Sequence, residues 1–157
     1  MAETLGSLVD KLAIKNLRHW HLNETMQAEG VSDSGNEELK AKIDLVDRQR
    51  KELSEEIDAF LGAALAGEVR IRDEKVKLYK NLNVESSDGL RQLGKAVDEL
   101  AMSNIKLWHL EDEVRREDLP DSKIVKTRRS IGTTNQERNN LMDKVDEIIE
   151  NAVKKAK

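Results

Sequence analysis

The sequence predicts an all-α protein, an antiparallel four-helix bundle built from two copies of one helical hairpin. Of its 157 residues, 37% are charged, 3% are aromatic and one is proline, a composition typical of long amphipathic helices. Residues 93–110 also match residues 5–22 without a gap, and ten of the eighteen positions are identical. The apolar residues of each copy recur every three or four positions, as they do along one face of a helix. Together these observations exclude a sheet protein.

The repeat covers a whole hairpin, because the same offset of 88 residues also aligns Arg50 with Arg138 and Asp58 with Asp146. We expect one domain over 1–157 with pseudo-two-fold symmetry. Its first hairpin is predicted at 1–62 and its second at 89–157. The segment 63–88 is predicted to be a linker that either extends the second helix or forms a short helix of its own.

The predicted helices lie near 3–29, 36–62, 89–117 and 122–154. The clearest apolar stripe belongs to the second helix and consists of Leu39, Ile43, Val46, Arg50, Leu53, Ile57 and Phe60. The first and third helices carry matching stripes, which are Leu5, Val9, Leu12, Asn16 and Trp20, and Leu93, Val97, Leu100, Asn104 and Trp108. The fourth helix carries Ile131, Thr134, Arg138, Leu141, Val145 and Ile148. Each stripe needs a partner surface.

Capping and turn residues support these boundaries. Ser34 followed by Glu37 predicts a capping box at the start of the second helix, and Pro120 lies in the corresponding turn of the second copy. Gly6 and Gly94 occupy equivalent places inside helices. A glycine there costs roughly 1 kcal/mol of helix propensity, so both are predicted to be points of close helix approach.

Polar residues interrupt the apolar stripes at equivalent places in both copies. In an antiparallel hairpin that turns near residue 33, Asn16 lies opposite Arg50, and Asn104 and Arg138 correspond to them in the second copy. Trp20 and Trp108 lie one turn away. We therefore expect one central layer of asparagine, arginine and tryptophan.

This layer has two interpretations. The first is a satisfied polar network that sets the register of the helices. The second is a pocket in which Asn16, Trp20, Arg50, Asn104, Trp108 and Arg138 bind an anionic ligand such as a phosphate or a nucleotide sugar.

A histidine and a carboxylate are three residues apart in each copy, as His21 with Glu24 and as His109 with Asp112. This spacing places both side chains on one helix face. The order is the reverse of the Glu-x-x-His motif of di-iron bundles. A hydrogen-bonded histidine at the edge of the core is the favoured interpretation, and a transition-metal site formed by these four residues is the alternative.

Charge and cysteine content exclude several classes of protein. The net charge of −4 predicts no bulk attraction to nucleic acid or to an anionic membrane. The chain has no cysteine, which excludes disulfides and thiolate metal sites. No run of 18 apolar residues and no secretory signal is found, so we expect a bacterial cytoplasmic protein.

Three segments of the first copy, GSLVDKLAIKNLRHWHL, DRQRKELSEEID and AGEVRIRDEKVKLYK, resemble a family of small bacterial helical proteins catalogued as a domain of unknown function. The second copy, with LWHLEDEVR and NQERNNLMDKVD, resembles another member of that family. The chain is therefore similar to a tandem duplicate of this domain. The resemblance implies a setting among bacterial glycosyltransferases and surface-polysaccharide genes, but it implies no reaction and no catalytic residue.

We expect a non-enzymatic helical binding or scaffold protein, an accessory to bacterial carbohydrate transfer, whose partner is an anionic small molecule or another protein. The alternative is a metal-dependent phosphohydrolase or a nucleotide-sugar-related enzyme. Its site would lie on the pseudo-two-fold axis and use Glu24, Asp112, Arg50 and Arg138. A third interpretation is a structural module that docks a partner through the linker carrying Tyr79. The cofactor and the oligomeric state stay open.

Overall fold

A computed structural model describes residues 3–28, 32–72 and 92–156. These residues form four α-helices, which are α1 (Leu5–Gln27), α2 (Asp33–Ala66), α3 (Leu93–Val114) and α4 (Asp121–Ala156). The described residues contain no strand. The predicted all-α fold with four helices is confirmed.

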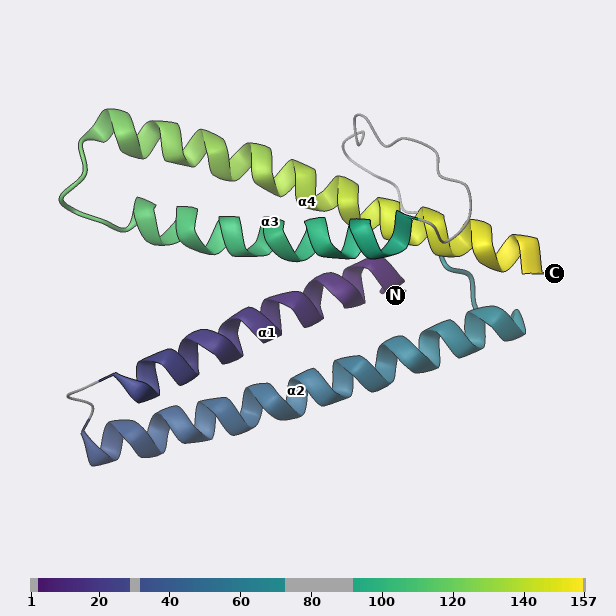
Figure 1. Cartoon of the computed structure of the whole chain (residues 1–157), viewed down its shortest axis with the longest axis horizontal. Coiled ribbons are helices and arrows are strands. Elements are labelled where there is room, and N and C mark those ends of the chain that lie inside the picture. The colour runs from purple at the N-terminus through teal and green to yellow at the C-terminus, as the bar shows by residue number, and fades with distance from the viewer. Residues whose placement is uncertain (1–2, 29–31, 73–91, 157) are drawn as a thin grey trace.

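Each pair of consecutive helices forms a hairpin whose arms run in opposite directions (Figure 1). In the first hairpin, Lys15 Nζ donates a hydrogen bond of 2.8 Å to Gln49 Oε1. Next to it, Arg50 Nε donates to Asn16 Oδ1 at 2.6 Å. The register that pairs Asn16 with Arg50 is therefore confirmed. In Figure 1, α1 and α3 run in one direction, and α2 and α4 run in the other.

The ends of α2 differ from the prediction. Ser32 caps the helix, since its hydroxyl accepts the backbone N–H of Gly35 at 3.2 Å. The predicted capping box is wrong, because Ser34 already lies inside α2. The helix continues past the predicted end at 62 to Ala66 and stops at Gly67, whose φ of 81° suits a glycine. The predicted linker lies outside the described residues from 73 onward.

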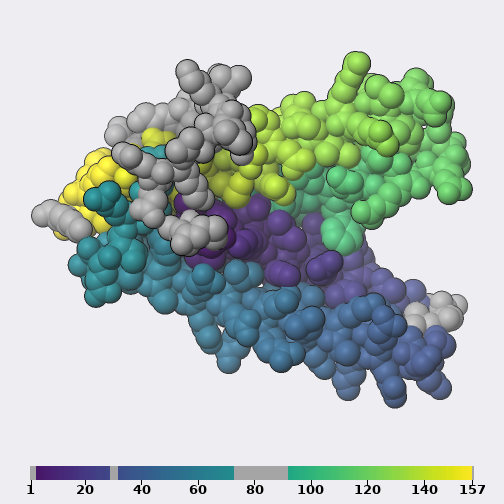
Figure 2. Space-filling model, turned by 180° about the vertical axis from the view of Figure 1, so that it is seen from behind, coloured from purple at the N-terminus to yellow at the C-terminus, as the bar shows by residue number. Residues whose placement is uncertain are grey.

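The two hairpins do not contribute equally to the packing. α1 contacts all three other helices, whereas the main packing of α2 is against α1 alone. The hairpins meet near the start of α1 and diverge toward the opposite end (Figure 1). Figure 2 shows the resulting hollow between α2 on one side and the second hairpin on the other. The bundle is therefore closed between α1 and α4 and open between α2 and α3.

The apolar core lies at the end where the hairpins meet. One buried cluster combines residues from α1, α2, α4 and the segment after α2, and its members are Leu5, Ala64, Ile71, Ile149 and Val153. A second cluster joins Ala96 of α3 to Val145 and Ile148 of α4. The start of α1 is thus held by three neighbouring segments, whereas α1 is the one described helix that packs beside the far end of α2.

Only one of the two matched glycines is a point of close approach. A Cβ atom on Gly6 would lie 2.2 Å from the backbone oxygen of Met142, so α1 and α4 touch at a place that only glycine allows. Among the described residues, a Cβ atom on Gly94 would meet nothing within 4 Å. The prediction is confirmed for Gly6 and wrong for Gly94, because none of the four described helices packs on α3 as α4 packs on α1.

Candidate functional site

In the first hairpin, the arginine of the predicted polar layer, Arg50, is bonded only to residues of that hairpin among the described contacts. Arg50 donates from Nε to Asn16 and from Nη1 to Asp47 Oδ1 at 2.8 Å. His19 Nε2 lies 3.1 Å from the same Asp47 oxygen. Arg50 therefore has both an amide and a carboxylate partner, and its side chain is about one-third exposed.

The second half is organised around a buried carboxylate that the sequence analysis missed. Asn104 Nδ2 donates to Asp10 Oδ1 at 2.8 Å, and Arg138 Nε lies 4.0 Å from the same oxygen. Asp10 and Asn104 are only 6% and 4% exposed. Asn104 and Arg138 lie at one level, as predicted, but they meet at Asp10 on α1. The available signal was the identity of Asp10 and Asp98 across the repeat.

The predicted single layer is therefore wrong, because its asparagines and arginines form two separate pairs and its tryptophans join neither pair. Asn16 and Arg50 lie between α1 and α2, while Asn104 and Arg138 lie where α1, α3 and α4 meet. Trp20 is 65% exposed. Trp108 is half-buried and stacks on His21, with ring centroids 4.3 Å apart and planes inclined by 5°. This ring pair joins the two hairpins.

Asn104, Trp108 and Arg138 line one pocket of about 380 Å³. Arg18 and Arg115 bring two more guanidinium groups to it. The remaining lining residues are Ile14, Leu17, Leu107, Glu111, Asp112 and Asn135. Within the described part of the chain, the buried Nε of Arg138 has no hydrogen-bond partner. This nitrogen is shielded from the surface and faces Asp10, so the positive charge that the pocket can offer an anion comes from the three arginines together.

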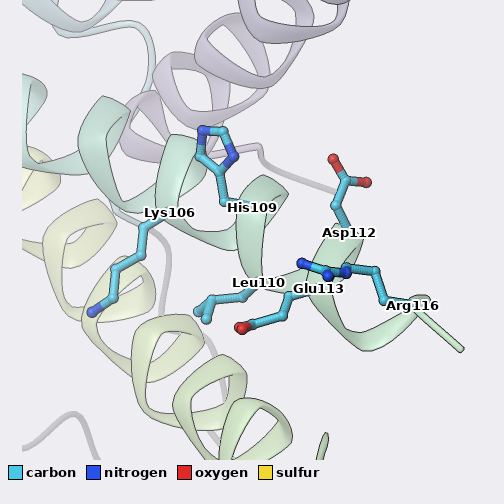
Figure 3. A pocket seen from close by; sticks show the side chains of 6 residues that line it. All are labelled: Lys106, His109, Leu110, Asp112, Glu113 and Arg116. Atoms are coloured by element: carbon cyan, nitrogen blue, oxygen red, sulfur yellow. The ribbon is translucent and has the colours of Figure 1, made fainter. Parts of the chain in front are cut away.

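The metal interpretation gains no support from the described ranges 3–28, 32–72 and 92–156, where no three histidine, aspartate or glutamate side chains are placed to hold a metal ion. His21 Nδ1 lies 2.9 Å from Glu24 Oε2 at the surface. His109 and Asp112 flank a shallow pocket that also contains the basic Lys106 and Arg116 (Figure 3). Basic neighbours disfavour a cation site.

A second buried carboxylate lies where α4 meets the start of α1. Asp146 is 2% exposed, and its Oδ1 accepts the backbone N–H of Gly6 at 2.6 Å. Backbone N–H groups in the first turn of a helix have no acceptor within that helix, and the N–H of Gly6 is one of them. Burial raises the pKa of Asp146 to about 6, although the hydrogen bonds from Gly6 and Thr4 oppose this shift. Asp146 therefore caps α1 from another helix.

The model of one family, described as a protein of unknown function (DUF4254), matches residues 1–72 and 94–157. The chain belongs to this family. The two matched segments contain the two hairpins, consistent with a tandem duplicate. The comparisons with curated proteins and with solved structures found no match. In the part of the chain that the structure describes, every helix is too short or too polar to cross a membrane.

Proposed function

We propose that this protein is a non-enzymatic binding protein whose ligand is a phosphate-bearing small molecule held in the pocket between α1, α3 and α4. The observation that carries the proposal is that three arginines, Arg18, Arg115 and Arg138, line one pocket and outnumber its two carboxylates, Glu111 and Asp112. A guanidinium cannot lose its proton at physiological pH, so these three positive charges persist and favour an anionic ligand.

The rest of the lining fits a phosphate joined to a ring or a sugar. Arg18 and Arg115 supply positive charge, and Trp108 offers an aromatic surface. Asn104 and Asn135 add amide groups for hydroxyl recognition. A volume of about 380 Å³ is near the lower end of the range for small-molecule sites. A nucleotide sugar, the class of ligand that suits an accessory to carbohydrate transfer, combines these chemical features.

Arg50 supplies the matched control for this proposal. It is identical to Arg138 across the repeat, but it is bonded to Asn16 and Asp47 and does not line the pocket. A role for the pocket therefore predicts different effects of changing the two arginines. A purely structural role predicts effects on stability alone.

The test is a thermal-shift titration with inorganic phosphate, UDP and UDP-glucose. A ligand at 100 times its Kd stabilises the protein by about 2.7 kcal/mol, which raises the Tm of a chain of this size by about 5–10 °C. Arg138→Met should abolish this rise, and Arg50→Met should retain it. Arg115→Gln, at an exposed rim position, should weaken binding without lowering stability. The proposal fails if no probe raises the Tm, or if Arg50→Met removes the rise as completely as Arg138→Met does.

A further inference from the structure

We propose that the chain also adopts a closed state in which α2 packs on α3 as α4 packs on α1. In this state Gly94, Asp98 and Asp58 would make the contacts that Gly6, Asp10 and Asp146 make in the structure. The open arrangement is the predominant state, and the closed one is a minor state.

The contact between α1 and α4 supplies the template. The N–H of Gly6 donates to Asp146, and α4 comes so close that a Cβ atom on Gly6 would lie 2.2 Å from the oxygen of Met142. One turn further along α1, Asp10 accepts from Asn104 and lies 4.0 Å from Arg138. Five residues thus define this interface, namely Gly6 and Asp10 of α1, Arg138 and Asp146 of α4, and Asn104 of α3.

Every member of this set has an identical counterpart at the offset of 88 residues. The counterparts are Gly94, Asp98, Asn16, Arg50 and Asp58. No described side chain or backbone atom lies close to Gly94, and both Asp58 and Asp98 are exposed. Gln92 is the counterpart of Thr4 across the repeat. Thr4 caps α1 with its side chain, whereas the side chain of Gln92 makes no capping bond to α3. Within 3–28, 32–72 and 92–156, the first turn of α3 therefore has no counterpart of the caps that Thr4 and Asp146 provide for α1.

A groove lies where the missing contact would form. It measures about 580 Å³, and all of its described lining residues belong to α1 or α3. Its apolar residues include the matched pairs Val9 with Val97, Ala13 with Ala101 and Leu17 with Ile105. Asn16, which α2 already holds through Arg50, also lines it. Closure of α2 would cover this apolar surface, and such burial is favourable.

The hairpins are joined at one end and diverge at the other (Figure 1), and the proposed closure is a rotation of α2 about the shared core. Asp58 and Gly94 both lie toward the joined end, where Phe60, Leu61 and Leu93 pack around the same cluster. Their contact requires the smallest movement. The occupant that we infer for the groove is therefore the chain's own α2, which is held close by at high effective concentration.

Distances between spin labels test closure without any ligand, and the absence of native cysteine makes labelling specific. Asp44→Cys with Lys106→Cys reports on α2 and α3, while Arg18→Cys with Gly132→Cys is the equivalent pair on α1 and α4. All four positions are exposed. We expect one short distance for the second pair. For the first pair we expect a long distance together with a minor component that matches the short one.

Gly94→Leu should remove the minor component, since a side chain there fits the open structure but blocks close approach of α2. Gly132→Leu, at another open glycine on α4, is the control and should keep it. Dilution with excess unlabelled protein should leave the component unchanged. A single long distance would overturn the proposal. Loss of the component on dilution would also overturn it, because a second copy's α2 would then occupy the groove.

Discussion

Asp146 shows how a single residue sets the pH dependence of this fold. Its folded pKa of about 6 lies above the ordinary value of 3.8, because burial penalises the charged form. The folded state therefore binds more protons than the unfolded state between these two values, and stability falls as the pH rises through this window. At neutral pH, ionised Asp146 costs roughly 3 kcal/mol of stability.

Asp146→Asn should remove this cost, because the asparagine oxygen still accepts the N–H of Gly6 and carries no charge. We expect the variant to be more stable than the parent at pH 7 and to match it near pH 4. Urea denaturation at several pH values measures both effects. Asp58→Asn is the control, since Asp58 is the exposed counterpart on α2 and should change little. Equal effects of the two substitutions would show that burial does not distinguish the two aspartates.

Of the polar contacts in the two hairpins, the sequence predicted the one within the first hairpin but not the one between hairpins. Asn16 opposite Arg50 followed from the register of one hairpin, and the structure confirms it. Asp10 was missed because its importance depends on contact between the hairpins, where it meets both Asn104 and Arg138. Asp98 is the same residue in the same local sequence and is exposed. Local pattern cannot separate two identical residues whose surroundings differ only through tertiary packing.

At the scale of single elements, α2 depends on its cap more than a buried helix would. Its main neighbour is α1, so burial stabilises only one of its faces. Ser32→Ala removes the acceptor for the N–H of Gly35 and should cost about 1 kcal/mol. Ser34→Ala, inside the helix, should cost much less. Thermal unfolding followed by circular dichroism compares the two variants, and a larger loss for Ser34→Ala would contradict the observed start of the helix.

The boundaries of α2 were less predictable than its existence. Heptad spacing identified the helix, but both Ser32 and Ser34 are good caps, and spacing does not choose between them. At the other end, Ala63, Ala64, Leu65 and Ala66 favour helix, and the left-handed Gly67 ends it. The heptad pattern of α2 ends before the helix ends, because Ala64 is the one described residue of the last turn that belongs to the buried cluster.

For the whole molecule, the duplicated sequence folds into two similar hairpins with unequal neighbours. The four helices followed from the repeat and its periodicity, both of which are local properties. The contact between α1 and α4, and the open face between α2 and α3, did not follow, since the repeat supports both contacts equally. The candidate pocket reflects this difference in packing. Arg138 of the second copy lines a pocket shared by α1, α3 and α4, whereas its counterpart Arg50 does not line that pocket.

The most direct test of this account compares two identical substitutions at equivalent positions, Gly6→Ala and Gly94→Ala, by the free energy of unfolding. Gly6→Ala should destabilise the protein by roughly 1–3 kcal/mol, because its Cβ would overlap the backbone of α4. Gly94→Ala has open space and gains helix propensity, so it should be neutral or stabilising by up to about 1 kcal/mol. Equal losses at both positions would contradict the unequal packing of the two hairpins.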